Sequence, residues 1–310
     1  MKRGKWFLLL GVVVVALSPL FRWQGARAPA PEFSYYLETP SAMRLVEVLS
    51  GRSDFERHQL VKLALNAAGI GYREEHISNQ IFRGANTVVE MGEGRDTVIF
   101  LAHTDRVADA PGANDNASCV AAGIDALKAL SKGPALQGVR LRFIFSDGEE
   151  SGLQGARYHA NNNDLSAVVG VASFELCGIG DAFGVWDVVG PAMNSAIVGA
   201  LHKAGENLKI YNGNHGAVPR FGSDHVAFVN KGVAGVGVTV LPRYDEDKLR
   251  SYVDDPNNPM WLLNFIRPVI FQTYHTSGDG PETVQSAALE MTTRLMLETV
   301  RTFERLGRER

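Results

Sequence analysis

The chain has 310 residues, enough for one large domain or two small ones, and its 45% hydrophobic and 21% charged residues are typical of a globular protein and exclude a disordered one. Five of the 31 basic side chains and none of the 34 acidic ones lie in the first 28 residues, so the rest of the chain carries a net charge of −8. Such an acidic body excludes a nucleic-acid partner, which requires a basic face, and suits a site for cations.

The first 28 residues have the layout of an export signal. Three basic residues precede an apolar run over 6–21, and a basic start followed by roughly 7–15 apolar residues directs export. The run is short for a membrane-spanning helix, which needs about 20 residues, although uncleaved signal anchors can be this short. Ala26-Arg27-Ala28 resembles a cleavage site, but Pro29 would follow the cut. We therefore expect either a cleaved signal peptide or a retained N-terminal membrane anchor, rather than a buried core helix.

Either interpretation places the rest of the chain outside the cytoplasm, as a periplasmic, secreted or membrane-anchored protein. A membrane would be a partner only through an uncleaved N-terminal segment. Residues 29–39 begin Pro-Ala-Pro and predict an extended linker, which leaves 40–310 for a single domain.

Two helices are expected to open this domain. The first covers about 41–49. The second begins at Ser53, where Glu56 is placed to complete a capping box, and ends before Gly69.

Strands and helices then alternate along the chain. Apolar runs predict strands over 86–90, 97–101, 139–145, 167–174 and 233–240. Helical spacing of apolar residues predicts helices over 116–130, 152–160, 193–204 and a long one after Pro281. The alternation predicts an α/β fold, with a central mixed, mostly parallel β-sheet flanked by helices.

Charged side chains stand at the ends of these apolar strands. His103 follows the strand at 97–101, Glu149 and Glu150 follow 139–145, and Glu175 follows 167–174. In open α/β sheets, ligands bind beyond the carboxyl ends of the strands. We therefore expect these side chains to converge at one edge of the sheet.

The residue types suit a zinc site. His103 and His275 can supply nitrogen, while Asp115, Glu150 and Glu175 can supply oxygen, and catalytic zinc takes such ligands. A carboxylate between two cations can bridge them at a separation of about 3.5–4 Å. The two cysteines lack the CxxC spacing of a thiolate zinc site, and two buried thiols are expected rather than a disulfide.

Two further carboxylates have roles that do not require binding the metal. If Glu150 is a ligand, Glu149 is available to take a proton from a water that the metal activates. Asp105 lies two residues after His103, where it can fix the imidazole tautomer.

Five stretches of this sequence resemble the co-catalytic zinc aminopeptidase family, which includes the bacterial leucyl aminopeptidases and has the glutaminyl cyclases as relatives. They are AHTD (102–105), PGANDNAS (111–118), FSDGEESGLQGA (145–156), FGSDH (221–225) and YHTSGD (274–279). The resemblance extends from about residue 40 to the C-terminus, and five motifs in the same order make it specific.

The resemblance implies a role for each matching residue. His103, Glu150, Glu175 and His275 would complete two metal sites bridged by Asp115. Glu149 would be the catalytic base, and Asp105 would support His103. Asp224 would make supporting hydrogen bonds near the centre, and the Asp115-Asn116 peptide would be cis.

Two positions depart from the family's usual pattern. Glu175 stands where an aspartate is usual, and its longer side chain shifts the ligand atom. Cys119 stands where glycine is common. Both departures bear on whether a second metal ion is bound.

The expected function is that of a metallo-aminopeptidase with two zinc ions, which removes N-terminal residues from peptides or aminoacyl substrates by metal-activated water. A glutaminyl-peptide cyclotransferase with one zinc is the alternative: its counterparts of Asp115, Glu150 and His275 hold the metal, and those of Glu149, Glu175 and Asp224 handle protons. A non-catalytic binding domain is the remote alternative. Nothing in the sequence indicates an oligomeric state.

Some aromatic residues could shape a substrate pocket. Trp186 and Trp261 could line it or pack in the core, and the polar insertion over 241–268 could form a lid or wall. The other histidines are expected to be surface or packing residues. They are His58, His76, His159, His202 and His215.

Overall fold

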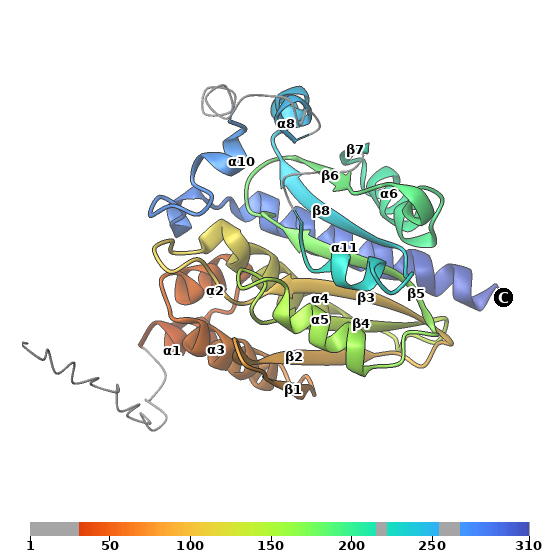
Figure 1. The fold of residues 1–310 in the computed structure, drawn as a ribbon, viewed down its shortest axis with the longest axis horizontal. Coiled ribbons are helices and arrows are strands. Elements are labelled where there is room, and N and C mark those ends of the chain that lie inside the picture. The colour runs from red at the N-terminus through yellow and green to blue at the C-terminus, as the bar shows by residue number, and fades with distance from the viewer. Residues whose placement is uncertain (1–30, 215–221, 254–266, 310) are drawn as a thin grey trace, which may run out of the picture.

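The computed structural model describes residues 31–214, 222–253 and 267–309 (Figure 1). The predicted signal or anchor over 1–28 lies outside the described residues, as do Trp261 and His215. The centre of the fold is an eight-stranded sheet with the order β1-β2-β4-β3-β5-β8-β6-β7. No described helix combines the length and the apolar character needed to cross a membrane.

The sheet is mixed and mostly parallel, as the sequence predicts. Strands β4, β3, β5 and β8 run parallel to one another at its centre, and β6 and β7 form a further parallel pair. The pairs β1·β2, β2·β4 and β6·β8 are antiparallel. The strands are β1 (Arg73–Ser78), β2 (Arg83–Met91), β3 (Asp96–His103), β4 (Val139–Ser146), β5 (Val168–Glu175), β6 (Ala182–Trp186), β7 (Tyr211–Asn214) and β8 (Gly235–Leu241).

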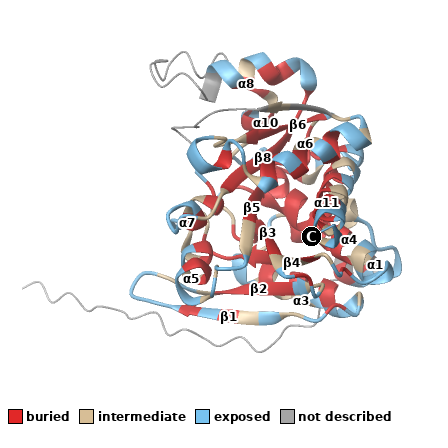
Figure 2. Cartoon of the chain, turned by 90° about the vertical axis from the view of Figure 1, so that its right-hand side faces the viewer, coloured by how far each residue is buried: buried red, intermediate tan, exposed pale blue. Residues whose placement is uncertain are grey.

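Helices cover both faces of the sheet (Figures 1 and 2). Helices α2, α3, α4, α6 and α11 pack on one face, and the shorter α5 and α7 pack on the other. The helices are α1 (Pro31–Glu38), α2 (Ala42–Leu49), α3 (Asp54–Ala67), α4 (Ser118–Lys132), α5 (Gln154–Asn162), α6 (Ala196–Leu208), α7 (His225–Val229), α8 (Glu246–Val253), α10 (Val269–Gln272) and α11 (Ser286–Arg308).

Strand β3 shows why the central strands are continuously apolar. Val98 and Phe100 point into the core under α4 and α11, whereas Ile99 and Leu101 point into the core under α5 and α7. Successive side chains of a strand face opposite sides of a sheet, so a strand covered on both sides must be apolar throughout. Figure 2 shows these central strands buried between exposed helix surfaces.

The expectation of an extended linker over 29–39 is wrong for Pro31–Glu38, which forms helix α1. Phe33 and Tyr36 of this helix are 1% and 2% exposed and pack into the main core. Proline is tolerated at the first position of a helix because its missing N–H has no partner there. Burial of two aromatic rings thus outweighs the local signal of the prolines. The predicted capping box of α3 is confirmed, with Ser53 and Glu56 bonding each other's backbone N–H.

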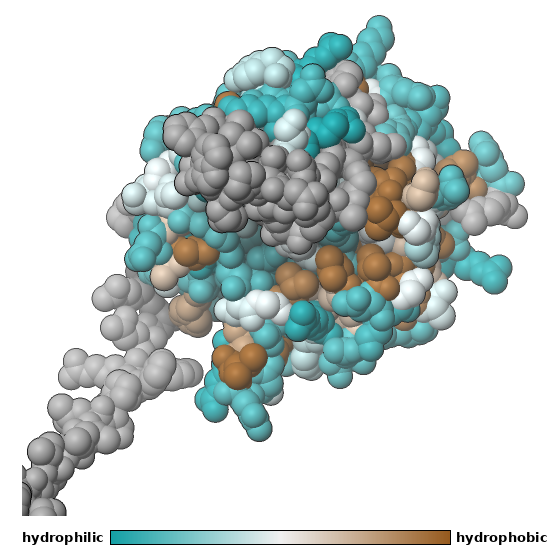
Figure 3. Space-filling view, turned by 45° about the horizontal axis from the view of Figure 1, so that its top comes forward, coloured by the Kyte–Doolittle hydropathy of each residue, from teal (hydrophilic) through white to brown (hydrophobic). Residues whose placement is uncertain are grey.

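The register of the parallel strands aligns their carboxyl ends. His103 at the end of β3 pairs with Ser146 at the end of β4, and Glu175 at the end of β5 pairs with Thr239 of β8. One edge of the sheet therefore carries polar side chains from four neighbouring strands. The surface seen in Figure 3 is mainly hydrophilic, with apolar side chains gathered in separate patches.

Candidate metal centre

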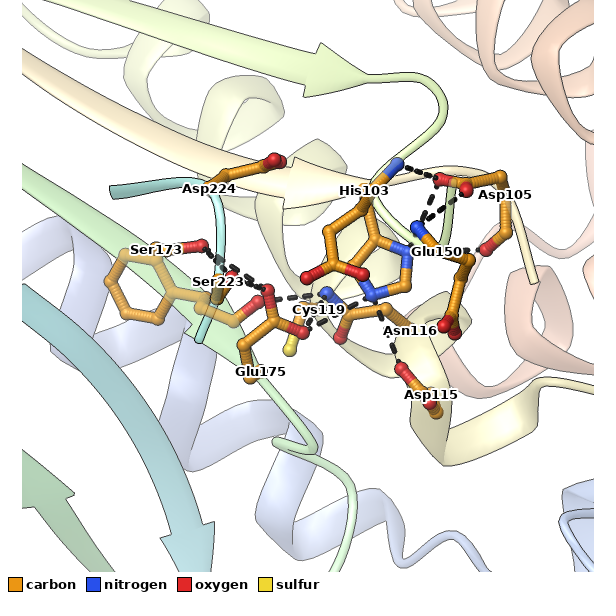
Figure 4. Close-up of polar contacts among 12 residues, drawn as sticks. His103, Asp105, Asp115, Asn116, Cys119, Glu150, Ser173, Glu175, Ser223 and Asp224 are labelled. Atoms are coloured by element: carbon orange, nitrogen blue, oxygen red, sulfur yellow. Dashed lines mark hydrogen bonds and ion pairs between the residues drawn. The ribbon is translucent and has the colours of Figure 1, made fainter. Parts of the chain in front are cut away.

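His103 is the buried centre of a group of carboxylates (Figure 4). Its Nε2 lies 3.1 Å from Asp115 Oδ1 and 3.2 Å from Glu175 Oε2. On the other side of the ring, Nδ1 lies 3.1 Å from the backbone oxygen of Asp105 and 3.5 Å from its carboxylate. If Nδ1 donates its hydrogen to Asp105, the Nε2 lone pair points at the two carboxylates and is available to a cation.

His275 forms a second group around the other oxygen of the same aspartate. Its Nε2 lies 3.2 Å from Asp115 Oδ2 and 3.1 Å from Glu150 Oε1. Asp115 thus presents one oxygen to each histidine. The structure therefore brings together all five residues that the sequence suggests as ligands, and their assignment as ligands stays a prediction.

The chemistry of these groups fits a pair of zinc ions. His103, Asp115 and Glu175 form one set, and Asp115, Glu150 and His275 form another, with the ligand atoms of each set within 4.8 Å of one another. Each set offers one imidazole nitrogen and two carboxylates, the ligand types of catalytic zinc. Because Asp115 belongs to both sets, its carboxylate is placed to bridge two cations.

The charges of these side chains depend strongly on one another. Burial disfavours a charged His103, but Glu175, Asp105 and Asp115 outweigh burial and hold the pKa of His103 well above its usual range. Burial likewise opposes the charge on His275, yet Asp115 and Glu150 raise its pKa to about 9. Both shifts have the same cause: the shared carboxylates favour a positive charge at each of these two positions.

Glu149 differs from Glu150 in the contacts of its side chain. Its side chain lines the same cavity, but among the described residues it makes no side-chain hydrogen bond. Burial raises the pKa of Glu149 well above the usual range, and the negative charges of Glu175, Asp224 and Glu150 raise it further. Asp105 fixes the backbone of this loop, because its carboxylate accepts the N–H groups of Glu149 at 3.1 Å and Glu150 at 3.0 Å.

Glu175 is held by three polar side chains to which the motifs alone assign no role. Ser173 Oγ donates to Glu175 Oε1 at 3.1 Å, Ser223 Oγ donates to the same oxygen, and Asn116 Nδ2 donates to Oε2 at 2.9 Å. Figure 4 shows both hydroxyls directed at this carboxylate. These contacts fix the longer side chain that stands here in place of the usual aspartate.

The Asp115 turn is held from the opposite end of the chain. Asp279 accepts the N–H of Asn114 at 2.9 Å and the N–H of Asp115 at 3.1 Å, one with each carboxylate oxygen. The cis peptide implied for Asp115-Asn116 is confirmed. Asp279 was overlooked as a site residue, although it ends the motif that contains His275.

Asp224 lies close to the centre without belonging to either set of ligands. It is buried, its Oδ2 accepts a hydrogen bond from Ser146 Oγ, and its Oδ1 has no partner among the described residues. Burial raises the pKa of Asp224 to about 7, and the nearby charge of Glu175 adds to the rise.

Cys119 and Cys177 are buried free thiols.

A cavity of about 420 Å³ opens beside these carboxylates. Trp186 lines it and also packs against the hydrophobic cluster that contains Leu176 and Ile270. Of the predicted lid over 241–268, Leu249 lines the cavity, whereas 254–266 lie outside the described residues. The remaining wall is largely apolar. It includes Leu153, Leu176, Ile270, Phe271 and Tyr274.

Two bacterial enzymes match segments of this sequence. A segment of 99 residues is 34% identical to the "Probable lipoprotein aminopeptidase LpqL" of Mycobacterium tuberculosis, covering 31% of this chain and 20% of that protein. A segment of 123 residues is 29% identical to "Leupeptin-inactivating enzyme 1" of Streptomyces exfoliatus, covering 38% of this chain and 28% of that protein. The matched segments thus span less than a third of either relative.

Solved structures share the fold at low sequence identity. A zinc aminopeptidase from Bacillus subtilis aligns with a TM-score of 0.56 and 19% identity over 71% of this chain and 50% of its own. A glutaminyl cyclase from Porphyromonas gingivalis aligns with a TM-score of 0.63 and 16% identity, over 88% and 99%. An Acidobacteriales glutaminyl cyclase aligns with a TM-score of 0.65 and 18% identity, over 92% and 99%.

The family itself follows from the sequence. The model of "Peptidase family M28" matches residues 86–300, which is more than half of the chain and includes every candidate ligand from His103 to His275. The chain belongs to peptidase family M28.

Proposed function

We propose that this chain is a zinc-dependent aminopeptidase that removes N-terminal residues from peptides. The observation that carries the proposal is the position of Asp115, whose two oxygens face His103 and His275 separately, with the Glu149 carboxylate beside them. The family membership and the aminopeptidase name of the Mycobacterium tuberculosis relative support the same reaction.

Two zinc ions would be held by the chain's own side chains. His103, Asp115 and Glu175 would hold one ion, and Asp115, Glu150 and His275 would hold the other. When bound, zinc supplies Lewis-acid chemistry, which polarises a carbonyl oxygen and lowers the pKa of water. Asp105 orients His103 through Nδ1 and so keeps Nε2 directed at the carboxylates.

Glu149 is the proposed base. It takes a proton from the attacking water and delivers it to the amine that leaves as the peptide bond breaks. Burial raises the pKa of Glu149, and a carboxylate with a raised pKa is a stronger base towards that water. The backbone hydrogen bonds from Glu149 and Glu150 to Asp105 keep the loop in place during these transfers.

The cavity suits a substrate with a free amine and an apolar first side chain. One side of the cavity is formed by the carboxylates of the proposed metal centre, where a bound zinc ion would be open to the free amine of the substrate. The other walls are apolar and, among the described residues, include no lysine or arginine.

Glu149→Gln provides the test. This change keeps the size of the side chain and removes the base, so hydrolysis of leucine p-nitroanilide should fall by about 10³-fold or more while the bound zinc is retained. Glu206→Gln, on the exposed surface of α6, is the matched control and should leave the rate unchanged. A near-normal rate for Glu149→Gln would show that the assigned base is wrong.

A second candidate is a glutaminyl cyclase with one zinc held by Asp115, Glu150 and His275. Two observations favour it: the hydroxyls of Ser173 and Ser223 and the amide of Asn116 already engage both oxygens of Glu175, and the alignments with cyclases cover almost the whole of those chains. Incubation with a peptide that begins with glutamine separates the candidates. A cyclase releases ammonia and leaves pyroglutamate, whereas an aminopeptidase releases free glutamine.

We also propose that the enzyme works outside the cytoplasm. The proposal is supported by the basic and apolar start of the sequence and by the name of the Mycobacterium tuberculosis relative, which describes a lipoprotein. Cell fractionation with an antibody against the chain tests it.

A further inference from the structure

Trp186 forms one wall of the cavity and is fixed by contacts on several sides. Its indole Nε1 donates to Thr239 Oγ1 at 3.1 Å. Its ring lies against Gly237, where a Cβ atom would stand only 2.0 Å from the ring. The edge-to-face contact with His225 has a centroid separation of 5.0 Å and an interplanar angle of 85°. A large flat side chain is therefore held in one orientation at the edge of the substrate cavity.

His225 is in turn held by the residue that follows the tryptophan. His225 is fully buried, and its Nε2 lies 2.9 Å from Asp187 Oδ2. Asp187 has φ +59°, a left-handed conformation that costs free energy for a residue other than glycine. Asp187 lies in this left-handed turn directly after Trp186, and from there its carboxylate contacts His225. A strained backbone beside a buried hydrogen-bonded side chain is typical of a site where geometry matters for function.

The same segment also reaches the metal centre. Ser223, two residues before His225, donates to Glu175, and Asp224, one residue before His225, accepts from Ser146. The proposed catalytic apparatus does not use His225 or Asp187. They instead connect the segment at the metal centre to Trp186 in the wall of the cavity.

We propose that Asp187 and His225 are a positioning pair that fixes Trp186, and that Trp186 thereby sets which first side chain the substrate cavity accepts. This inference rests on the proposed aminopeptidase function for its substrate. It predicts that loss of the pair weakens binding of large apolar first residues and changes kcat little, because the metal ligands and Glu149 are untouched.

The kinetic test compares leucine and alanine p-nitroanilides. Trp186→Ala should raise KM for the leucine substrate by about tenfold, since the apolar wall that the indole ring supplies to the cavity is lost. Asp187→Ala should raise the same KM severalfold. Asp187→Asn should leave this KM close to the wild-type value, because the amide oxygen can still accept a hydrogen bond from His225. The alanine substrate, which is too small to reach the wall, should show less than a twofold change. Asp164→Ala, an exposed aspartate on the turn before β5, is the matched control.

A binding test separates this inference from the proposed function. Leucinamide and alaninamide are titrated calorimetrically into zinc-loaded Glu149→Gln protein, with and without Asp187→Ala. A weaker leucinamide affinity on loss of Asp187, in protein that is still folded and has an unchanged zinc content, supports the positioning pair even if the wild type hydrolyses no aminoacyl amide. Equal effects on both ligands, a change in kcat alone, or no leucinamide binding would overturn it.

Discussion

At the scale of single residues, the position of Asp115 is set by its backbone. Asp279 accepts the N–H groups of Asn114 and Asp115, and its own backbone oxygen accepts the N–H of Ala113. Three successive peptide groups are therefore anchored to one residue, and the carboxylate that the two histidines share is placed before any cation binds. Pre-organisation of this kind lowers the cost of assembling a metal site.

Asp279→Ala tests this anchoring. Two buried N–H groups lose their acceptor, so we expect the free energy of unfolding to fall by about 3 kcal/mol and the dissociation constant for zinc to rise about 10–100-fold. Chemical denaturation and competition with a chelator measure the two effects. Asp279→Asn retains one acceptor and should lie between the wild type and Asp279→Ala. An unchanged zinc affinity in both variants would contradict the proposed anchoring.

The sequence predicted individual site residues where a motif carried them. His103, Asp115, Glu149, Glu150 and His275 each lie in such a motif, and the structure brings them together. The supporting residues were missed because their partners are remote in sequence: the bond between Asp279 and Asp115 spans 164 positions, and that between Ser223 and Glu175 spans 48. Spacing alone carries no signal for such contacts.

At the scale of elements, a buried polar network joins β1, β2 and α5. Glu75 of β1 lies 2.9 Å from Nδ1 of His159 in α5 and accepts from Asn86 of β2 at 3.0 Å. Asn86 also accepts the N–H of Asp147, which precedes the Glu149 loop. His159 is therefore a satisfied packing histidine, in agreement with the sequence-based expectation.

Glu75→Gln tests the contribution of this network to stability. Burial opposes the charge on Glu75, but His159 and Asn86 outweigh it and lower its pKa to about 2. Because the pKa of Glu75 is lower in the folded protein than in the unfolded chain, where it is near 4.5, the charge on Glu75 stabilises the fold at pH values above 4.5. This stabilisation is lost as the pH falls towards 2. The variant should be about 3 kcal/mol less stable than the wild type at pH 7, and the difference should vanish near pH 2.

The measurement is urea denaturation of both proteins between pH 7 and pH 2. Both are kept free of metal with a chelator, so that loss of zinc does not contribute to the pH dependence. Glu206→Gln on the surface serves as the control. A difference between wild type and Glu75→Gln that stays constant across this range would refute the assigned role of the Glu75 charge.

The central strands and main helices were predictable because their apolar periodicity is strong. Strand β1 was missed because it lies at the edge of the sheet and its sequence, Arg-Glu-Glu-His-Ile-Ser, carries four charged or titratable side chains. Helix α1 was missed because local proline signals were outweighed by the burial of Phe33 and Tyr36. In both cases tertiary contacts decide the structure.

At the scale of the whole molecule, the fold explains how distant residues form one site. Parallel strands place His103, Ser146 and Glu175 at the same edge of the sheet, and loops that follow bring Asp115, Glu150 and His275 against them. The mixed, mostly parallel sheet flanked by helices was predictable from the alternation of strands and helices, whereas the strand order was not. The mutual distances, and hence two sets of ligands that share Asp115, required the structure.

The zinc content of purified variants tests the shared centre most directly. After the metal-free protein is reloaded and unbound metal is removed, we predict two zinc ions per chain in the wild type, one in His103→Ala, one in His275→Ala and none in Asp115→Ala, together with loss of leucine p-nitroanilide hydrolysis in all three. One zinc per chain in the wild type, unchanged in His103→Ala, would contradict a two-ion centre and leave a single site formed by Asp115, Glu150 and His275.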